Sequence, residues 1–140
     1  MTDARKPAVL FVCQTNGGKS QMAAGLMRLV AGEEVEISSA GTKAGGSLNE
    51  LSAEVLLDLG ADIRAEHPTQ LTEEAMRQAG RVVILGTNAQ VDPVEGVTVE
   101  RWETDEPSLR GIEGRERMEL LRDDILARVR DLRGRLLTDD

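Results

Sequence analysis

An apolar run that turns directly into a glycine-bearing loop is the feature that most constrains the fold. Residues 8–13 (AVLFVC) are continuously apolar, the pattern of a strand buried on both faces of a sheet. Residues 14–18 (QTNGG) then break the run with turn-forming residues. From Ser20 the apolar residues step by three or four up to Gly32, which predicts a helix. Strand, loop and helix in this order open a βαβ unit.

The same alternation recurs along the rest of the chain. Strands are expected at residues 35–42, 81–85 and 97–102, and helices at residues 49–59, just after Thr72 and along the C-terminal stretch. The last helix is marked by apolar residues at helical spacing: Met118, Leu121, Ile125, Val129, Leu132 and Leu136. The pattern predicts one domain over residues 1–140, a three-layer α/β/α fold with a four-stranded parallel sheet. Ligands of such sheets bind at the carboxyl ends of the strands, where Cys13 lies.

Charge and aromatic content exclude several classes of function. The chain carries 17 Lys and Arg against 25 Asp and Glu, a formal net charge of -8. Nucleic-acid binding is therefore not expected, because its affinity comes mainly from basic side chains that neutralise phosphates. The aromatic residues are Phe11 and Trp102, with no tyrosine, so base-stacking platforms and deep aryl pockets are not expected either.

No membrane or metal association is expected. No apolar run approaches the roughly 18 residues that a membrane helix needs. Residues 1–7 are too short and polar for a signal peptide, so a cytoplasmic location is expected. His67 is the only histidine, and no cluster of metal-ligating residues accompanies it.

The loop at residues 13–20 carries the chemistry. Its small residues and the helix that follows present backbone N–H groups that converge on an oxyanion. The predicted oxyanion-binding residues are Gln14, Thr15, Asn16, Gly17, Gly18, Lys19 and Ser20.

Two interpretations of this loop compete. In the first, Gly18-Lys19-Ser20 ends a nucleotide-binding P-loop, but Cys13 stands where that motif begins with glycine. A P-loop enzyme also needs an acidic residue on a neighbouring strand, and residues 86–88 (GTN) supply none.

The second interpretation makes Cys13 a nucleophile, and we favour it. A helix N-terminus and the Lys19 cation would both stabilise a thiolate. Ser20 is placed to hydrogen-bond the sulfur, while Asn16 is expected to hold the shape of the loop. A buried, inert cysteine is the alternative, but it leaves the Gly-Gly-Lys-Ser sequence unexplained.

These residues resemble a known superfamily along nearly the whole chain. The opening matches at VLFVC (residues 9–13), Asn16, Ser20, Met22 and Ala23, the second strand at SSAGT (residues 38–42), and the later segments at Leu71-Thr72 and from Trp102 to Pro107. The chain thus resembles the low-molecular-weight protein tyrosine phosphatase and arsenate reductase superfamily. The resemblance implies that superfamily's α/β fold, a cysteine nucleophile and a carboxylic acid on a loop that ends in proline.

Two departures from the superfamily pattern matter. The superfamily's loop has arginine at the sixth position after the cysteine, where this chain has Lys19. Arginine clamps two oxygens with a planar fork, whereas lysine offers a point charge. At the acid loop Glu106 stands in the place of aspartate, with Asp105 just before it, so either carboxylate is a candidate proton donor.

The residues around the site point to the reductase branch. Tyrosine phosphatases of the superfamily carry tyrosines after the acid-loop proline, whereas Pro107 is followed by Ser108 and Leu109. The NGGKSQMA segment is similar to that of arsenate reductases from mycothiol-producing bacteria. Thioredoxin-coupled relatives use two further cysteines, and this chain has none besides Cys13.

The resemblance therefore implies an arsenate-mycothiol transferase with no bound cofactor. Its co-substrate would be mycothiol or another low-molecular-weight thiol, and a mycoredoxin-like partner would release arsenite. Two alternatives stay open: a phosphatase that forms a phosphocysteine, and a non-catalytic oxyanion-binding relative.

Overall fold

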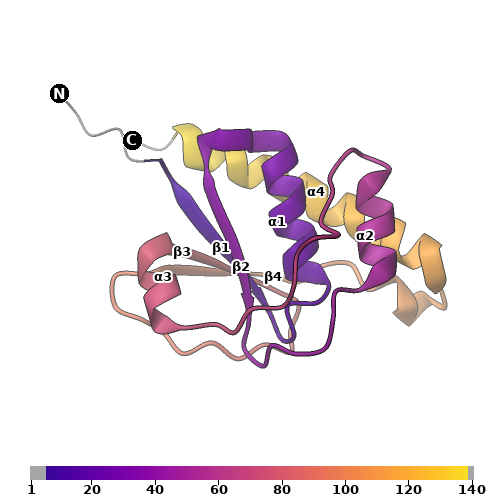
Figure 1. Cartoon of the computed structure of the whole chain (residues 1–140), viewed down its shortest axis with the longest axis horizontal. Coiled ribbons are helices and arrows are strands. Elements are labelled where there is room, and N and C mark those ends of the chain that lie inside the picture. Colours follow the sequence, from indigo (N-terminus) through magenta and orange to yellow (C-terminus); the bar gives the residue numbers. More distant parts are fainter. Residues whose placement is uncertain (1–5, 139–140) are drawn as a thin grey trace.

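Four parallel strands form the single sheet of the structure, a computed structural model that describes residues 6–138. Most of the N-terminal segment considered above as a signal peptide, residues 1–5, lies outside the described residues, as do residues 139–140. The strands are β1 (Ala8–Cys13), β2 (Glu36–Gly41), β3 (Arg81–Leu85) and β4 (Thr98–Trp102), in the order β2-β1-β3-β4 (Figure 1). The predicted four-stranded parallel sheet is confirmed.

Helices cover both faces of this sheet. The helices α1 (Lys19–Ala31), α2 (Glu50–Leu57) and α4 (Gly114–Thr138) pack together on one face, and α3 (Glu73–Ala79) packs on the other (Figure 1). Two short 3-10 turns complete the structure, η1 (Gly32–Glu34) after α1 and η2 (Pro107–Arg110) after β4. This is the α/β/α arrangement expected from the alternation of elements. None of the helices in residues 6–138 combines the length and the apolar character that a membrane span requires.

The two faces of the sheet bury cores of different size. The larger core joins Phe11 of β1 to Leu26 of α1 and Ile125 of α4, all without exposed surface. The smaller core packs Met76 of α3 against Val82 of β3 and its neighbours. Each fully buried side chain of this size contributes about 1.5–3 kcal/mol relative to exposure. The apolar series of the C-terminal helix faces the larger core as predicted, with Leu136 only partly buried.

The helix ends agree with the sequence at one helix and differ at another. Thr72 caps α3 by accepting a hydrogen bond from Ala75 N at 3.1 Å, as predicted. The helix predicted over residues 49–59 is shorter, because the Leu56 carbonyl accepts from both Leu59 N and Ala61 N and closes α2 early. The apolar spacing of Leu51, Val55, Leu56 and Leu59 predicts that all four face inward. For Leu59 this prediction is wrong, because it lies beyond the end of the helix and is 37% exposed.

Candidate active site

The loop after β1 wraps around the sulfur of Cys13, at the carboxyl edge of the sheet. The Cys13 side chain is buried, with 8% of its surface exposed. Its Sγ lies 3.0 Å from Ser20 Oγ, and the backbone N–H of Asn16 donates to it at 3.2 Å. The predicted contact between Ser20 and the sulfur is therefore present. Two polar groups converge on one thiol, an arrangement that stabilises negative charge on sulfur.

Asn16 holds the shape of this loop, as the sequence indicated. It is fully buried and adopts a φ of +61°, the left-handed conformation that asparagine tolerates better than most residues. Its Nδ2 donates to Ser20 Oγ at 2.7 Å, and its Oδ1 accepts from Thr69 N at 2.9 Å. Gln21 Nε2 adds a hydrogen bond to the Asn16 carbonyl at 3.2 Å. The side chain that fixes the loop thus also orients the hydroxyl that contacts Cys13.

Gly41, the last residue of β2, lets the loop lie against the neighbouring strand. A Cβ atom at this position would lie 2.8 Å from the Gln14 carbonyl oxygen and 2.9 Å from Asn16 N. Both are backbone atoms, which cannot move aside as the end of a side chain can. The Thr42 amide donates to the Cys13 carbonyl at 3.1 Å, so the two strands remain joined where the loop begins. Glycine is required here by contact rather than by conformation.

A small hollow of about 190 Å³ opens beside Cys13. Its walls are the loop after β1 and the end of β3 with the residues that follow: Cys13, Gln14, Thr15, Gly18, Lys19, Leu85, Gly86, Thr87 and Asn88. Helix α1 begins at its edge, and Gly18 at the N-cap provides no side-chain cap. The first N–H groups of a helix that lacks such a cap are available to an anion. The hollow combines a nucleophile, a helix N-terminus and a lysine.

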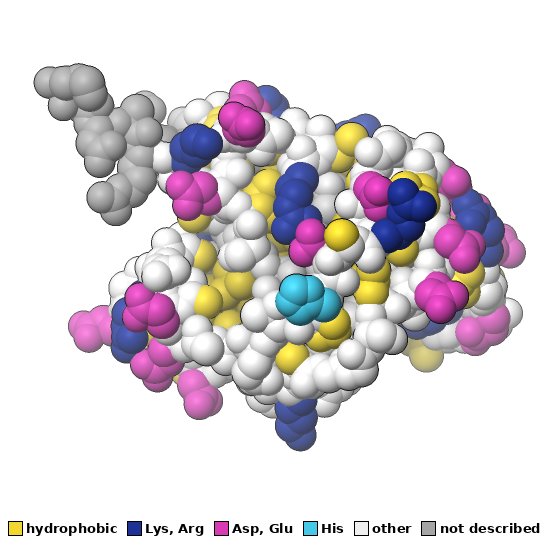
Figure 2. Space-filling view, viewed as in Figure 1, with side chains coloured by type: hydrophobic (Ala, Val, Ile, Leu, Met, Phe, Trp, Pro, Cys, Tyr) yellow, Lys and Arg dark blue, Asp and Glu magenta, His cyan; other side chains and the backbone are white. Residues whose placement is uncertain are grey.

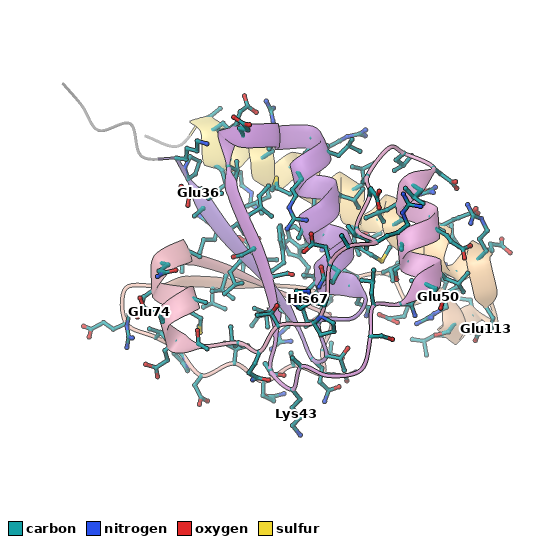
Figure 3. All side chains as sticks on the ribbon, viewed as in Figure 1. Glu36, Lys43, Glu50, His67, Glu74 and Glu113 are labelled. Carbon is teal, nitrogen blue, oxygen red and sulfur yellow. The ribbon has the colours of Figure 1, made fainter. Side chains whose placement is uncertain are left out.

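A larger hollow lies elsewhere in the molecule. It measures about 520 Å³ and is formed by α2 and the segments on either side of it, with His67 at its edge. Figure 2 shows this face, with His67 exposed near its centre, and Figure 3 shows Lys43 pointing away from the molecule below it. Cys13 does not line this hollow. We place the site at the smaller one because the nucleophile and its partners are there.

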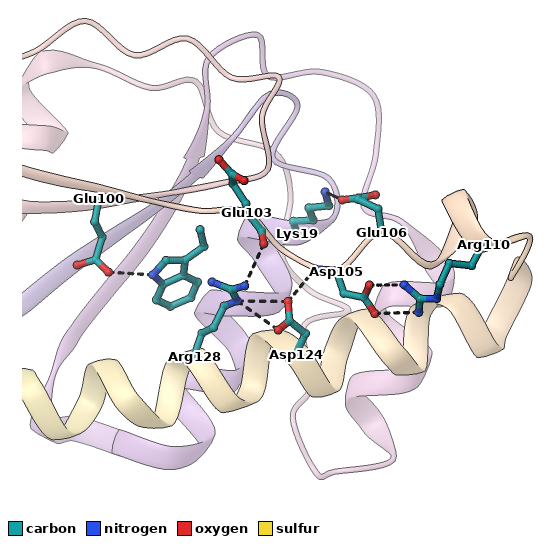
Figure 4. Close-up of polar contacts among 9 residues, drawn as sticks. Lys19, Glu100, Glu103, Asp105, Glu106, Arg110, Asp124 and Arg128 are labelled. Atoms are coloured by element: carbon teal, nitrogen blue, oxygen red, sulfur yellow. Dashed lines mark hydrogen bonds and ion pairs between the residues drawn. The ribbon is translucent and has the colours of Figure 1, made fainter.

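Lys19 forms an ion pair with Glu106 at the candidate site, and this separates the two acidic candidates. The Lys19 and Glu106 side chains are 23% and 33% exposed, so both are partly screened from solvent. Asp105 instead pairs with Arg110, whose two hydrogen bonds measure 2.7 and 3.2 Å (Figure 4). These hydrogen bonds hold the pKa of the Asp105 carboxyl below its usual value. The structure brings Glu106 to the loop and directs Asp105 away from Lys19.

A solvated helix surface is the simpler expectation for Asp124, with a contact near the acid loop as the alternative, and the structure shows the alternative. Its Oδ2 accepts a hydrogen bond from the backbone N–H of Asp105 at 2.8 Å, and Arg128 Nε donates to the same carboxylate at 3.2 Å. The contact joins α4 to a loop 19 residues earlier, which the helical pattern alone does not reveal. Its one sequence signal is an Asp-Arg pair at i, i+4 beside the apolar face of α4.

Arg101 is a second residue that the sequence did not single out. Its guanidinium donates to the Gly86 carbonyl at 2.7 Å and to the Ala89 carbonyl at 2.9 Å. These bonds brace the loop after β3, which forms one wall of the hollow beside Cys13. Nothing in the local sequence marks an arginine within a strand as a brace, so it could be found only from the fold.

Core packing is the simplest expectation for Trp102 and a solvated loop position that for His67, and the structure shows both. Trp102 is 5% exposed and packs on Phe11 with ring centroids 5.8 Å apart, and its Nε1 donates to Glu100 at 2.8 Å. His67 is exposed, and its backbone carbonyl accepts from Gln21. Across residues 6–138, no group of three or more His, Cys, Asp or Glu side chains is arranged to hold a metal ion.

Comparisons with known proteins identify the family of this chain. Residues 8–138 match the profile of the family described as low molecular weight phosphotyrosine protein phosphatase. An arsenate reductase of Halalkalibacterium halodurans is 32% identical over 106 residues, which are 74% of this chain and 76% of that protein.

Solved structures share the fold. A thioredoxin-dependent arsenate reductase of Corynebacterium glutamicum has a TM-score of 0.82 at 27% identity, over 99% of this chain. This chain spans 66% of the length of that protein. A tyrosine phosphatase of Erwinia amylovora has a TM-score of 0.79 at 20% identity, over 97% of both chains, a likeness of fold alone.

Proposed function

This chain belongs to the low molecular weight phosphotyrosine protein phosphatase family, and we propose that it is an arsenate reductase that transfers arsenic from Cys13 to an external thiol. The observation that supports the proposal is a single cysteine whose sulfur contacts Ser20 Oγ and Asn16 N, in a loop that leads into the uncapped N-terminus of α1. The 32% identical arsenate reductase supports the choice of substrate. The co-substrate we propose is mycothiol, with a mycoredoxin-like protein as the second reductant in the cytoplasm.

The first step is attack of the Cys13 thiolate on arsenate. Backbone N–H groups of residues 14–20 and the Lys19 ammonium would hold the oxygens of the anion, replacing the Glu106 carboxylate as the partner of Lys19. A sulfur–arsenic bond forms and an arsenic–oxygen bond breaks, with the departing oxygen leaving as water. Arsenic stays pentavalent in this step, so no electrons are transferred.

Glu106 is the proton donor we propose for the departing oxygen. Its carboxylate is the one that the structure brings to Lys19, beside the loop that would hold the anion. General acids of this kind contribute about 10²–10⁴-fold to a rate. Asp105 is unsuited to the role, because its pairing with Arg110 favours the ionised carboxylate and keeps it at a distance from Lys19.

The later steps need two electrons from outside the chain. An external thiol attacks arsenic, a new sulfur–arsenic bond forms and Cys13 leaves as thiolate. A second thiol then attacks the sulfur of that adduct. A disulfide forms, the electrons of the sulfur–arsenic bond pass to arsenic, and arsenite is released. In sum, arsenate and two thiols give arsenite, one disulfide and water. With one cysteine in the chain, an intramolecular disulfide cannot supply these electrons.

A phosphatase that forms a phosphocysteine is the second candidate. The family description and the shared fold of the tyrosine phosphatase favour it. Lys19 favours the reductase over the phosphatase. Its ammonium is a point charge that is already paired with Glu106, so it binds a phosphoryl group more weakly than a bidentate arginine would. A chain that binds the oxyanion without chemistry is the third.

One assay separates these candidates. Arsenite formation is measured from arsenate with mycothiol and its redoxin, beside hydrolysis of an aryl phosphate by the same preparation. Arsenite that depends on the thiol and is lost in Cys13→Ser supports the proposal. Hydrolysis without arsenite indicates a phosphatase, and undiminished turnover by Cys13→Ser would exclude the mechanism. Bound arsenate with neither activity indicates a binding protein.

A further inference from the structure

The acid loop, residues 103–106 between β4 and η2, is held by hydrogen bonds from helix α4. Asp124 Oδ2 accepts from the backbone N–H of Asp105 at 2.8 Å, and Arg128 Nη2 donates to the carbonyl of Glu103 at 2.9 Å. The two side chains are themselves joined, since Arg128 Nε lies 3.2 Å from both carboxylate oxygens of Asp124 (Figure 4). One ion pair thus binds the backbone on both sides of Thr104.

The helix that supplies this ion pair is firmly packed. Ile125 and Val129, which follow Asp124 and Arg128 along α4, have no exposed surface and belong to the larger core. The Asp124 and Arg128 side chains are 26% and 35% exposed, so their hydrogen bonds are partly shielded from water. A rigid helix therefore fixes the position of two peptide groups in a loop that has no regular structure of its own.

Glu106 directly follows Asp105, whose backbone N–H donates to Asp124. From this position the Glu106 carboxylate contacts Lys19. The Asp105 side chain does not contact Lys19 and pairs with Arg110 of η2. The location of the Glu106 carboxylate thus depends on the contacts from α4.

We propose that Asp124 and Arg128 are positioning residues that hold Glu106 at the Cys13–Lys19 site. The inference rests on the proposed role of Glu106. It adds to that function two residues on a distant helix that touch neither substrate nor nucleophile and act through the backbone of the acid loop.

The variants that test this are Asp124→Ala and Asp124→Asn, with Asp131→Ala as the matched control. Asp131 is on the same helix, and its carboxylate accepts a hydrogen bond from Arg135 at 3.0 Å. This pair is a suitable control because Arg135 contacts Glu100 of β4 instead of the acid loop. Asp124→Ala removes the acceptor for Asp105 N and should lower kcat for arsenate by about 10- to 100-fold, the range expected from misplacing a catalytic group. Asp124→Asn keeps an acceptor oxygen and should retain most of kcat. Asp131→Ala should match the parent.

The Glu106→Gln background distinguishes positioning from a general loss of structure. If Asp124 acts through Glu106, Asp124→Ala should lower kcat less than about twofold once Glu106 is replaced, because the two changes remove the same contribution. An equal loss in both backgrounds would overturn the inference while leaving the reductase function intact, as would a parent-like kcat for Asp124→Ala. Thermal unfolding followed by Trp102 fluorescence shows that each variant is folded.

A binding measurement keeps the inference testable if the chain proves not to reduce arsenate. Titration calorimetry with inorganic phosphate should show tighter binding in Asp124→Ala than in the parent, because Glu106 no longer competes for Lys19. The same change should have no effect in Glu106→Gln. This pair of results would support the positioning role even if the chain does not reduce arsenate. The role would be contradicted if Asp124→Ala changed phosphate affinity equally in the parent and in Glu106→Gln, or did not change the affinity of the parent.

Discussion

The ammonium of Lys19 is paired with the carboxylate of Glu106, a residue 87 positions later in the chain, at the rim of the loop that surrounds Cys13. The charge of Lys19 is therefore neutralised by the protein itself. In the proposed reaction, an incoming oxyanion exchanges places with this carboxylate. The same residue thus opposes binding and is the proton donor proposed for the chemical step.

Glu106→Gln should affect binding and catalysis in opposite directions. Removing the competing charge should tighten phosphate binding by up to about fivefold, since a partly exposed ion pair contributes about 1 kcal/mol or less. Losing the acid should lower kcat for arsenate by about 100-fold. Calorimetry with phosphate and steady-state kinetics with arsenate measure the two effects. Weaker phosphate binding in the variant would show that Glu106 does not compete for Lys19.

Lys19 should tolerate arginine but not a neutral side chain. Lys19→Met removes the only positive charge of residues 13–20 and should weaken phosphate binding by about tenfold or more. Lys19→Arg restores the planar fork that suits two oxygens and should bind phosphate at least as tightly as the parent. Calorimetry on both variants measures this. Equal affinity of Lys19→Met and the parent would mean that the anion is held elsewhere.

Gly41→Ala should damage the loop through direct contact. The new Cβ would lie 2.8 Å from the Gln14 carbonyl oxygen, so the loop or the strand must shift. Overpacking of this kind costs about 1–3 kcal/mol, measurable by urea unfolding, and kcat should fall as well. Gly45→Ala is the matched control, because a Cβ there meets no atom within 4 Å. Equal stability of the two variants would contradict the contact argument.

Asp105→Asn should change how the stability of the fold depends on pH and should leave kcat close to that of the parent. Arg110 lowers the pKa of Asp105 in the folded chain, so the ionised carboxylate adds stability above its unfolded pKa. That contribution is lost as pH falls through the folded pKa. The difference in melting temperature between parent and variant should therefore be present at neutral pH and vanish in acid. A kcat reduced about 100-fold would instead identify Asp105 as the acid.

The sequence predicts the parts of this site that are local. The Cys13–Ser20 loop is bounded by a strand and a helix with clear apolar patterns, so its place and the contact between Ser20 and the sulfur follow from the order of residues. The choice between Asp105 and Glu106 as the residue that contacts Lys19 does not follow from the order of residues. They are neighbours in an irregular loop, and which one faces Lys19 depends on the position of that loop in the fold.

The hydrogen bonds from α4 that fix the acid loop also could not be derived from the sequence pattern. Asp124 and Arg128 look like a solvated pair on a helix, and only the packing of α4 beside the acid loop gives them hydrogen bonds to its backbone. Arg101 is a similar case, because its acceptors are carbonyls 12 and 15 residues away. Long-range contacts to backbone groups leave no pattern in residue types.

The decisive measurement is the amount of arsenite that the reduced enzyme releases in a single turnover without any external thiol. A chain that holds arsenic on Cys13 and has no second cysteine cannot supply two electrons by itself. The account predicts no arsenite until mycothiol and its redoxin are added, and then about one arsenite per thiol pair oxidised. One arsenite per chain before any thiol is added would contradict it.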